Sequence, residues 1–340
     1  MDKEKFKEAT GLAALYYKVP QHANTIKYSL GGLTLFCFLV TIGSGILMSQ
    51  FYSPSPTTAY ASVNYINSTS GIRLIRGVHF WSGNLALGML IIHFLRVILT
   101  GAFRPPRVLT YFVGLGLLLV IFLIYFTGTV LRWDQEGYEA LTHFLSVNKL
   151  LGPIGAFFQE DFTLSTSILS RIFALHTSNL QIILIATIAL KVFYIKYFGI
   201  SPKPYQTEVE YQASLDGNST FMGHAKLLLI LSVCLFTVIF VLAIFFQPGL
   251  FPPAKPGMEM TKPAWIFWIF VPFENVFGIP GILIGSAVIA AWFLSFPIVG
   301  IFLRDERKLF RTVYVLVAIG LIFWVIMMSY TYFAPAMSHF

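Results

Sequence analysis

Three histidines in apolar parts of the chain have the spacing expected of ligands to iron. His79 and His93 lie 14 residues apart. A helix rises 1.5 Å and turns 100° per residue, so it would separate them by about 21 Å along its axis and only about 40° around it. They would therefore share one face, near opposite ends. His176 begins a second apolar stretch, at the depth of His79 if both stretches start on the same side of a membrane. Two imidazoles at one depth suit an iron held from both sides.

The alternative reading of each histidine is a polar contact between helices. Three histidines at matching depths favour iron ligation over that reading. The remaining histidines fall in expected loops or termini, and we assign no role to them: His22, His143, His224 and His339.

Glycines repeat the same interval of 14 residues. One pair is Gly31 and Gly45, and the other is Gly114 and Gly128. A flat macrocycle between helices needs positions from which no side chain projects, and glycine supplies them. Close packing of helices through small residues is the alternative. The match with the histidine interval favours two stacked haems.

Arginines lie close to these histidines. Arg76 precedes His79 by three residues, Arg171 precedes His176 by five, and Arg96 follows His93 by three. Guanidinium groups pair well with carboxylates, so they are candidates for binding haem propionates. Interfacial snorkelling explains the arginines as well, and for Arg96 the two readings have equal weight.

Long apolar runs must position all of these residues. The chain has 340 residues, of which 56% are hydrophobic and 11% charged, and its mean hydropathy is +0.75. A run of about 20 apolar residues spans the hydrocarbon core of a bilayer. Such runs cover roughly 28–51, 77–100, 108–131, 172–197, 225–247, 278–302 and 310–333. We therefore predict an all-α integral membrane protein of about seven transmembrane helices, with no cleavable signal before them.

Basic residues predict the orientation. Most of the 23 Lys and Arg residues, Lys3, Lys5 and Lys7 among them, fall on one side if the N-terminus is inside. Lys and Arg are retained on the cytoplasmic side during insertion. We therefore expect an energy-transducing membrane with the N-terminus on its inner, cytoplasmic side. The net charge of +8 is then explained by topology and anionic lipid, and nucleic-acid binding is disfavoured.

Two cysteines, Cys37 and Cys234, are too few to hold an iron–sulfur cluster or a c-type haem with two thioethers. A partner must carry any such centre. The polar stretch 199–223 suggests two units, a four-helix haem-binding bundle at 1–204 and three further helices at 205–340. Long loops at 132–171 and 248–276 are expected to be functional or docking surfaces.

Several motifs together resemble one family. They are VPQHANTIKYSLGG, SVNYI, IRGVHFWS, HFLRVILTGAFRPPR, TGTVLRWDQEGYEA, RIFALHT and FGISPKP. The chain resembles cytochrome b of the bc and bf complexes, and is most similar to the shorter, chloroplast-type version fused to the three C-terminal helices. KPAWIFW stands at the place of the family's PEWY motif.

The resemblance implies two b haems, a quinol-oxidising pocket on the outer side and a quinone-reducing pocket on the inner side. His79 and His176 would hold the outer haem, and His93 one side of the inner haem. The implied partners are a Rieske-type iron–sulfur protein on the outer loops, a c-type cytochrome, quinone, lipid and a second copy of the chain in a homodimer.

The fourth ligand departs from the family pattern. The family's histidine lies 14 or 15 residues beyond the third, where this chain has Leu190 and Lys191. The surrounding sequence fits the longer spacing, so lysine replaces histidine. A neutral amine can ligate iron, and we favour ligation. In the alternative Lys191 snorkels to the inner surface and the inner haem is five-coordinate or absent.

Three more departures concern the outer pocket and an extra haem. Ala264 occupies the position of the PEWY glutamate, a proton acceptor that alanine cannot replace. Glu274 is a candidate catalytic replacement, or else a solvated carboxylate. Arg132 replaces the proline of the family's PWDQ and puts a charge beside the pocket. Ser29 stands in place of the cysteine that attaches an extra haem in the chloroplast-type protein, so we expect that haem to be missing.

The leading hypothesis is a cytochrome b subunit of a quinol oxidoreductase of the quinol:cytochrome c type, inactive alone. It would pass one electron outward and one inward through both haems. The alternative is a haem b membrane anchor that exchanges electrons between an outer-side redox enzyme and the quinone pool without bifurcation. Ala264 and Arg132 favour this alternative. A scaffold without redox activity is a third reading, disfavoured by the remaining ligands.

Overall fold

The computed structural model describes residues 9–11, 13, 16–217 and 219–335. His339, Lys3, Lys5 and Lys7 lie outside these residues. Within them, seven helical spans are long and apolar enough to cross a membrane. The spans are α2 (Ile26–Ser49), α4 (Ser70–Leu99), α5 (Val108–Leu131), the continuous run from α8 (Ile168–Ala174) to α9 (Leu180–Phe198), α11 (Phe221–Phe245), α13 (Pro280–Phe302) and α14 (Glu306–Phe333). The expectation of an all-α integral membrane protein is confirmed.

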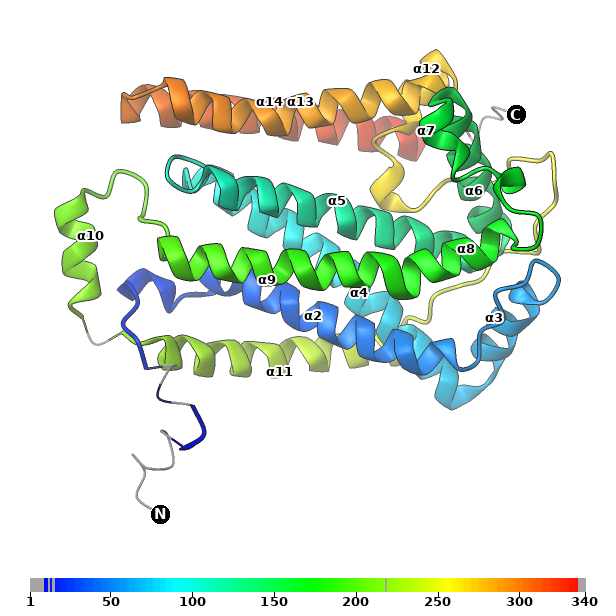
Figure 1. Cartoon of the computed structure of the whole chain (residues 1–340), viewed down its shortest axis with the longest axis horizontal. Helices are drawn as coiled ribbons and strands as arrows, with labels where there is room; N and C mark the ends of the chain where they lie inside the picture. Colours follow the sequence, from blue (N-terminus) through cyan, green and yellow to red (C-terminus); the bar gives the residue numbers. More distant parts are fainter. Residues whose placement is uncertain (1–8, 12, 14–15, 218, 336–340) are drawn as a thin grey trace.

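Short helices cover the two ends of this bundle (Figure 1). One end carries α3 (Ala59–Ser68), α6 (Gln135–Leu150), α7 (Pro153–Ala156) and α12 (Val271–Phe277). The opposite end carries α10 (Glu208–Leu215). The loops 132–171 and 248–276 therefore meet at one end, which we call the outer end.

Five spans begin earlier than hydropathy predicts, and α4 differs the most. α4 begins at Ser70 instead of 77, and the fourth span begins at Ile168 instead of 172. Hydropathy marks only the part of a helix that suits hydrocarbon, whereas the helix itself continues into the polar interface. At the fourth span the side chain of Ser167 accepts a hydrogen bond from the backbone N–H of Ser170 and so caps the helix start.

Five spans share one apolar core. α2 pairs with α4 and α5 pairs with α9, and α11 packs against α2 and α4. Their buried contact includes one residue from each span: Cys37, Leu87, Leu117, Leu184 and Ile239. Many apolar side chains face outward instead, for example Ile185 and Phe193, each 59% exposed. Outward apolar faces are what lipid requires.

The three C-terminal spans lie on two sides of the four-helix bundle. α11 lies along α2 and α4, whereas α13 and α14 lie side by side beyond α5 (Figure 1). A second core joins that pair to the bundle through Phe94, Tyr111, Phe296 and Phe310. The hydroxyl of Tyr111 donates to the carbonyl oxygen of Phe293 at 2.7 Å. The division between residues 204 and 205 stays a prediction.

Candidate ligand pairs and the outer pocket

The imidazoles of His79 and His176 face each other across the bundle. His79 comes from α4, and His176 from a π-helical turn at Leu175–Asn179 between α8 and α9. Their ring centroids are 6.4 Å apart, and their planes differ by 66°. Two imidazoles on opposite sides of one metal, each bonded at about 2 Å, place their centroids about 6 Å apart. The separation therefore fits one shared metal.

Backbone carbonyls select the tautomer of both rings. Nδ1 of His79 lies 2.9 Å from the carbonyl oxygen of Thr41. Nδ1 of His176 lies 3.1 Å from the carbonyl oxygen of Ile124 and 2.9 Å from the hydroxyl of Thr127. A carbonyl oxygen only accepts, so each Nδ1 carries the proton and donates it. Each Nε2 then keeps its lone pair for a metal.

Each of the four spaced glycines lies against one expected ligand. A Cβ on Gly45 would come within 2.9 Å of the His79 ring, and one on Gly128 within 3.1 Å of the His176 ring. The same holds at the inner end, where Gly31 lies against His93 and Gly114 against Lys191, at 3.2 and 3.0 Å. The glycines thus leave room for the donor side chains themselves, and larger residues would displace them.

The π-helical turn explains why the fourth position falls at Lys191. One extra residue in such a turn advances the chain without the usual rotation. Lys191, fifteen residues after His176, therefore lies on the same helix face as His176. Its Nζ lies against Gly114 and donates to the carbonyl oxygen of Thr110 at 2.5 Å. Leu190 points outward and is 43% exposed, so it is excluded as the counterpart.

His93 is less constrained than the outer histidines. Its Nδ1 is buried and has no hydrogen-bond partner among the described residues. A buried ring nitrogen without a partner is costly, and the donor set of an imidazole and an amine suits a borderline metal such as iron. The donor types of the inner pair therefore fit haem iron, but no carbonyl oxygen in the described part of the chain orients the ring of His93 as Thr41 and Ile124 orient those of His79 and His176.

The three arginines all have protein contacts. Arg76 is buried and donates to the carbonyl oxygens of Pro248 and Gly249, at 2.5 and 3.0 Å. Arg171 donates to two carbonyl oxygens of the 157–159 segment. The guanidinium of Arg96 stacks on the ring of Tyr28 at 3.7 Å. These contacts tie loops and helices together, and propionate binding stays a prediction.

The segment with Ala264 contributes to a small hydrogen-bonded group of polar side chains inside the bundle. Ala264 precedes a short 3₁₀ turn, Trp265–Phe267. The indole N–H of Trp265 and the hydroxyl of Tyr125 both donate to Oδ1 of Asn84, at 2.9 and 3.1 Å. Neither Asn84 nor Tyr125 was predicted from the sequence. An amide within an apolar span was the available signal, since polar groups at that depth usually serve a site.

The charge of Arg132 is paired with acidic groups. Its guanidinium lies 2.5 Å from the carboxylate of Glu136 and 3.6 Å from that of Asp134. Burial raises the pKa of Glu136, although Arg132 opposes that change. Asp134 itself accepts from the backbone N–H groups of Gly137 and Phe251. Arg132 thus adds a neutralised ion pair to the outer end.

Glu274 is buried and bound to a histidine. Its carboxylate lies 2.9 Å from Nε2 of His143, which also lies 3.3 Å from the carboxylate of Glu259. Burial alone would lower the pKa of His143, but the two carboxylates raise it to about 10. The sequence reasoning gave His143 no role, because its partners come from distant parts of the chain.

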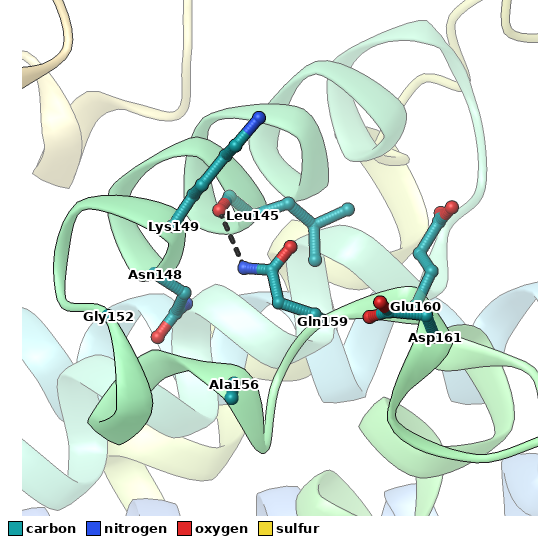
Figure 2. Close-up of a pocket in the computed structure, with 8 residues that line it drawn as sticks. All are labelled: Leu145, Asn148, Lys149, Gly152, Ala156, Gln159, Glu160 and Asp161. Carbon is teal, nitrogen blue, oxygen red and sulfur yellow. Dashed lines mark hydrogen bonds between the residues drawn. The ribbon is translucent and has the colours of Figure 1, made fainter.

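The outer loops also form an open pocket of about 510 Å³. It lies between the C-terminal end of α6 and the segment 152–161, where the side chain of Gln159 donates to the carbonyl oxygen of Leu145 at 3.0 Å (Figure 2). Its lining includes Lys149, Glu160 and Asp161 but neither His79 nor His176. The pocket therefore belongs to the loop surface and not to the ligand pairs. Among the described residues, no three His, Cys, Asp or Glu side chains cluster as a metal site would require.

Comparison with known proteins gives consistent matches. Residues 15–199 match a family described as cytochrome b/b6/petB. The chain is 39% identical to the cytochrome b6 of Prochlorococcus marinus strain MIT 9303 over 188 residues, which cover 54% of this chain and 86% of that protein. Strain NATL1A gives 38% identity over the same length. The fold is similar to a chain of a solved "Hyperthermophilic respiratory Complex III", with a TM-score of 0.69, 18% identity and coverage of 97% of this chain and 98% of that one.

Proposed function

The chain belongs to the cytochrome b/b6/petB family, and from this membership we propose that it carries electrons across the bilayer through two haems b. It is an integral membrane cytochrome b subunit of a quinol-oxidising electron-transfer complex. Haem iron, when bound, exchanges one electron at a time, whereas quinol releases two. The two electrons of quinol must therefore leave by two separate routes. Two ligand pairs at different depths would supply one of these routes.

The outer pair carries the proposal. His79 and His176 meet at a centroid separation of 6.4 Å, with both Nδ1 protons committed to carbonyl oxygens. Carbonyl acceptors fix the ring orientation and raise the basicity of the ligating nitrogen. Gly45 and Gly128 keep the space that both rings need. We assign the outer haem to this pair.

We assign the inner haem to His93 and Lys191. Lys191 lies at the inner end of the bundle as His176 lies at the outer end. The side chain of Lys191 lies against Gly114 of α5, and that of His176 lies against Gly128 of the same helix. To bind a metal, the amine must lose a proton and give up its bond to the Thr110 carbonyl oxygen. If Lys191 keeps that bond, the inner haem is five-coordinate. Arg76, Arg96 and Arg171 remain the candidate propionate partners.

The quinol pocket is proposed at the outer end, beside Trp265. Ala264 offers no proton acceptor there, whereas Glu274 is a buried carboxylate ten residues further on. We therefore assign proton acceptance from quinol to Glu274. The expected partners are a Rieske-type iron–sulfur protein on the outer loops and a c-type cytochrome, in a homodimeric complex of the quinol:cytochrome c type with the N-terminus inside.

Haem content tests this proposal directly. The purified protein should contain two haems b per chain by the pyridine haemochrome spectrum. His176→Leu should remove one of them, whereas His224→Gln should retain both. Protein purified without porphyrin, or a His176→Leu variant that still holds two haems, would refute the assignment.

Ala264 also favours a second candidate function. A haem b anchor that exchanges electrons with the quinone pool without bifurcation needs no proton acceptor at that position. The two functions differ in their partners. A Rieske protein should copurify in the first case, and inhibitors of the outer pocket should stop turnover. If neither holds, the anchor function is supported.

A further inference from the structure

His143 joins the two ends of the segment that contains Ala264. Glu259 lies five residues before Ala264 and Glu274 lies ten residues after it. Both carboxylates meet Nε2 of His143 on α6, at 3.3 and 2.9 Å. The side chains of Glu274, Glu259 and His143 are 8%, 9% and 18% exposed. We call these three residues the carboxylate–imidazole cluster.

This cluster shares a wall with the proposed quinol pocket. Phe144 follows His143 and contacts Phe126 of α5, with ring centroids 5.0 Å apart. Phe126 in turn contacts Phe267, at 6.1 Å, in the turn that follows Ala264. One helical turn before His143, the carboxylate of Glu139 accepts from the backbone N–H groups of Met260 and Thr261. These contacts hold the segment with Ala264 against the face of α6 that carries His143.

The charge of the cluster leaves capacity for one proton. An imidazolium with two carboxylates carries a net charge of −1, which a single proton neutralises. The carboxylates raise the pKa of His143 to about 10, so the imidazole is already protonated near neutral pH. Uptake must therefore fall on a carboxylate.

We propose that His143, Glu259 and Glu274 together accept the proton that quinol releases in the outer pocket and pass it to the outer surface. This inference rests on the proposed function and deepens it. A quinol O–H bond breaks and a carboxyl O–H bond forms on Glu274, and the second quinol proton follows by the same route once Glu274 has passed on the first. Both electrons of the quinol leave to one-electron acceptors, one through the haem pairs and one to the iron–sulfur partner.

The contacts of His143 give the transfer a route. Nε2 of His143 lies within ion-pair distance of both carboxylates, whereas Nδ1–H donates to the carbonyl oxygen of Glu139 at 2.7 Å. A proton that arrives on buried Glu274 can move to Nε2 as the proton already there moves to Glu259. Glu259 then releases it to water. His143 is thus a positioning and relay residue, and Glu274 is the catalytic residue.

The other charged and titratable groups near the cluster have their own partners. On α6, Glu139 binds the 260–261 backbone, and Glu136 binds Arg132. Lys262 donates to the carbonyl oxygen of Tyr332. On α5, Tyr125 donates to Asn84, and on α14 the hydroxyl of Tyr330 accepts from Asn275. The span α13, which also packs on α6, has no titratable side chain.

The test is single-turnover reduction of haem b by a short-chain quinol in the purified complex, followed across the pH range. Glu274→Gln should slow reduction about 100-fold near neutral pH, with the KM for quinol unchanged. Glu274→Asp should restore part of the rate. Glu259→Gln and His143→Gln should change the shape of the pH profile. Glu306→Gln is the matched control, because it breaks the Arg104–Glu306 pair outside the cluster.

A second readout does not depend on rate. Oxidation of bound quinol should produce a carboxylic C=O infrared band in the wild-type complex, and Glu274→Gln should abolish it. A cluster that only ties α6 to α12 would give variants with lower thermal stability, an unchanged pH profile and the same infrared band. That result would overturn the inference.

Failure of the proposed function looks different. If the wild-type complex contains haem but does not oxidise quinol in its outer pocket, both the function and the inference fail. If the wild-type complex oxidises quinol and all three variants keep its pH profile, only the inference fails.

Discussion

Lys191 lies against Gly114 as His176 lies against Gly128, so an amine and an imidazole occupy corresponding positions against α5. The Nζ of Lys191 is 3.0 Å from the position of a Cβ on Gly114, and the corresponding distance from the His176 ring to a Cβ on Gly128 is 3.1 Å. Both glycines belong to α5 and both facing residues to the fourth span. The same scaffold thus presents two different donor types at two depths.

Replacement of Lys191 should therefore affect one haem only. Lys191→Ala should change the reduced spectrum and the midpoint potential of the inner haem, because its sixth ligand is lost, and leave the outer haem unchanged. Lys191→His should give an inner haem with the spectrum of two imidazole ligands. Redox titration of the purified variants measures both effects. Lys196→Ala, an exposed lysine of the same helix, is the control, and equal spectra for Lys191→Ala and this control would contradict ligation.

Substitution of Gly128 should shift the imidazole of His176 from its place without removing that side chain. In Gly128→Val, the added side chain would occupy the space of the His176 ring, which already lies 3.1 Å from a Cβ at that position. We expect the outer haem to be lost or to become high-spin, while the inner haem remains. Haem quantification with an electron paramagnetic resonance spectrum measures this. Gly116→Val on the same helix has open space at its Cβ and should retain both haems.

The buried ion pair of Arg132 and Glu136 should behave as a unit. Arg132→Leu leaves the carboxylate of Glu136 buried without its cation, because the two groups lie 2.5 Å apart. Loss of one partner of a buried pair costs about 3–5 kcal/mol. The Tm of the purified protein should fall in the single variant and recover in the double variant Arg132→Leu/Glu136→Leu. A double variant less stable than the single one would show that the pair is not the cause.

Helix periodicity explains which parts could be predicted from the sequence. A period of 3.6 residues and the length of the apolar runs determine the seven spans and place His79 level with His176. The π-helical turn at Leu175–Asn179 has no comparable sequence signal, although the longer spacing to Lys191 is its consequence. His143 was missed because its two carboxylates approach only after α6 and α12 have packed at the outer end. Contacts of that kind depend on tertiary structure, which local pattern does not encode.

The stability contributed by His143 should depend on pH in a defined direction. The carboxylates of Glu259 and Glu274 raise its pKa in the folded protein to about 10, whereas an unfolded chain has a pKa of about 6.5. The folded state therefore holds this proton more tightly than the unfolded state. The resulting stabilisation is fully present below about pH 6.5 and decreases as the pH rises towards 10, where the folded imidazolium is itself deprotonated.

The difference in Tm between wild type and His143→Gln should accordingly be largest in mild acid and shrink in alkali. Glu306→Gln should show no such trend, since the Arg104–Glu306 pair contains no histidine. A Tm difference for His143→Gln that stays constant from pH 6 to pH 10 would contradict this prediction. It would mean that Glu259 and Glu274 do not stabilise a proton on the imidazole of His143.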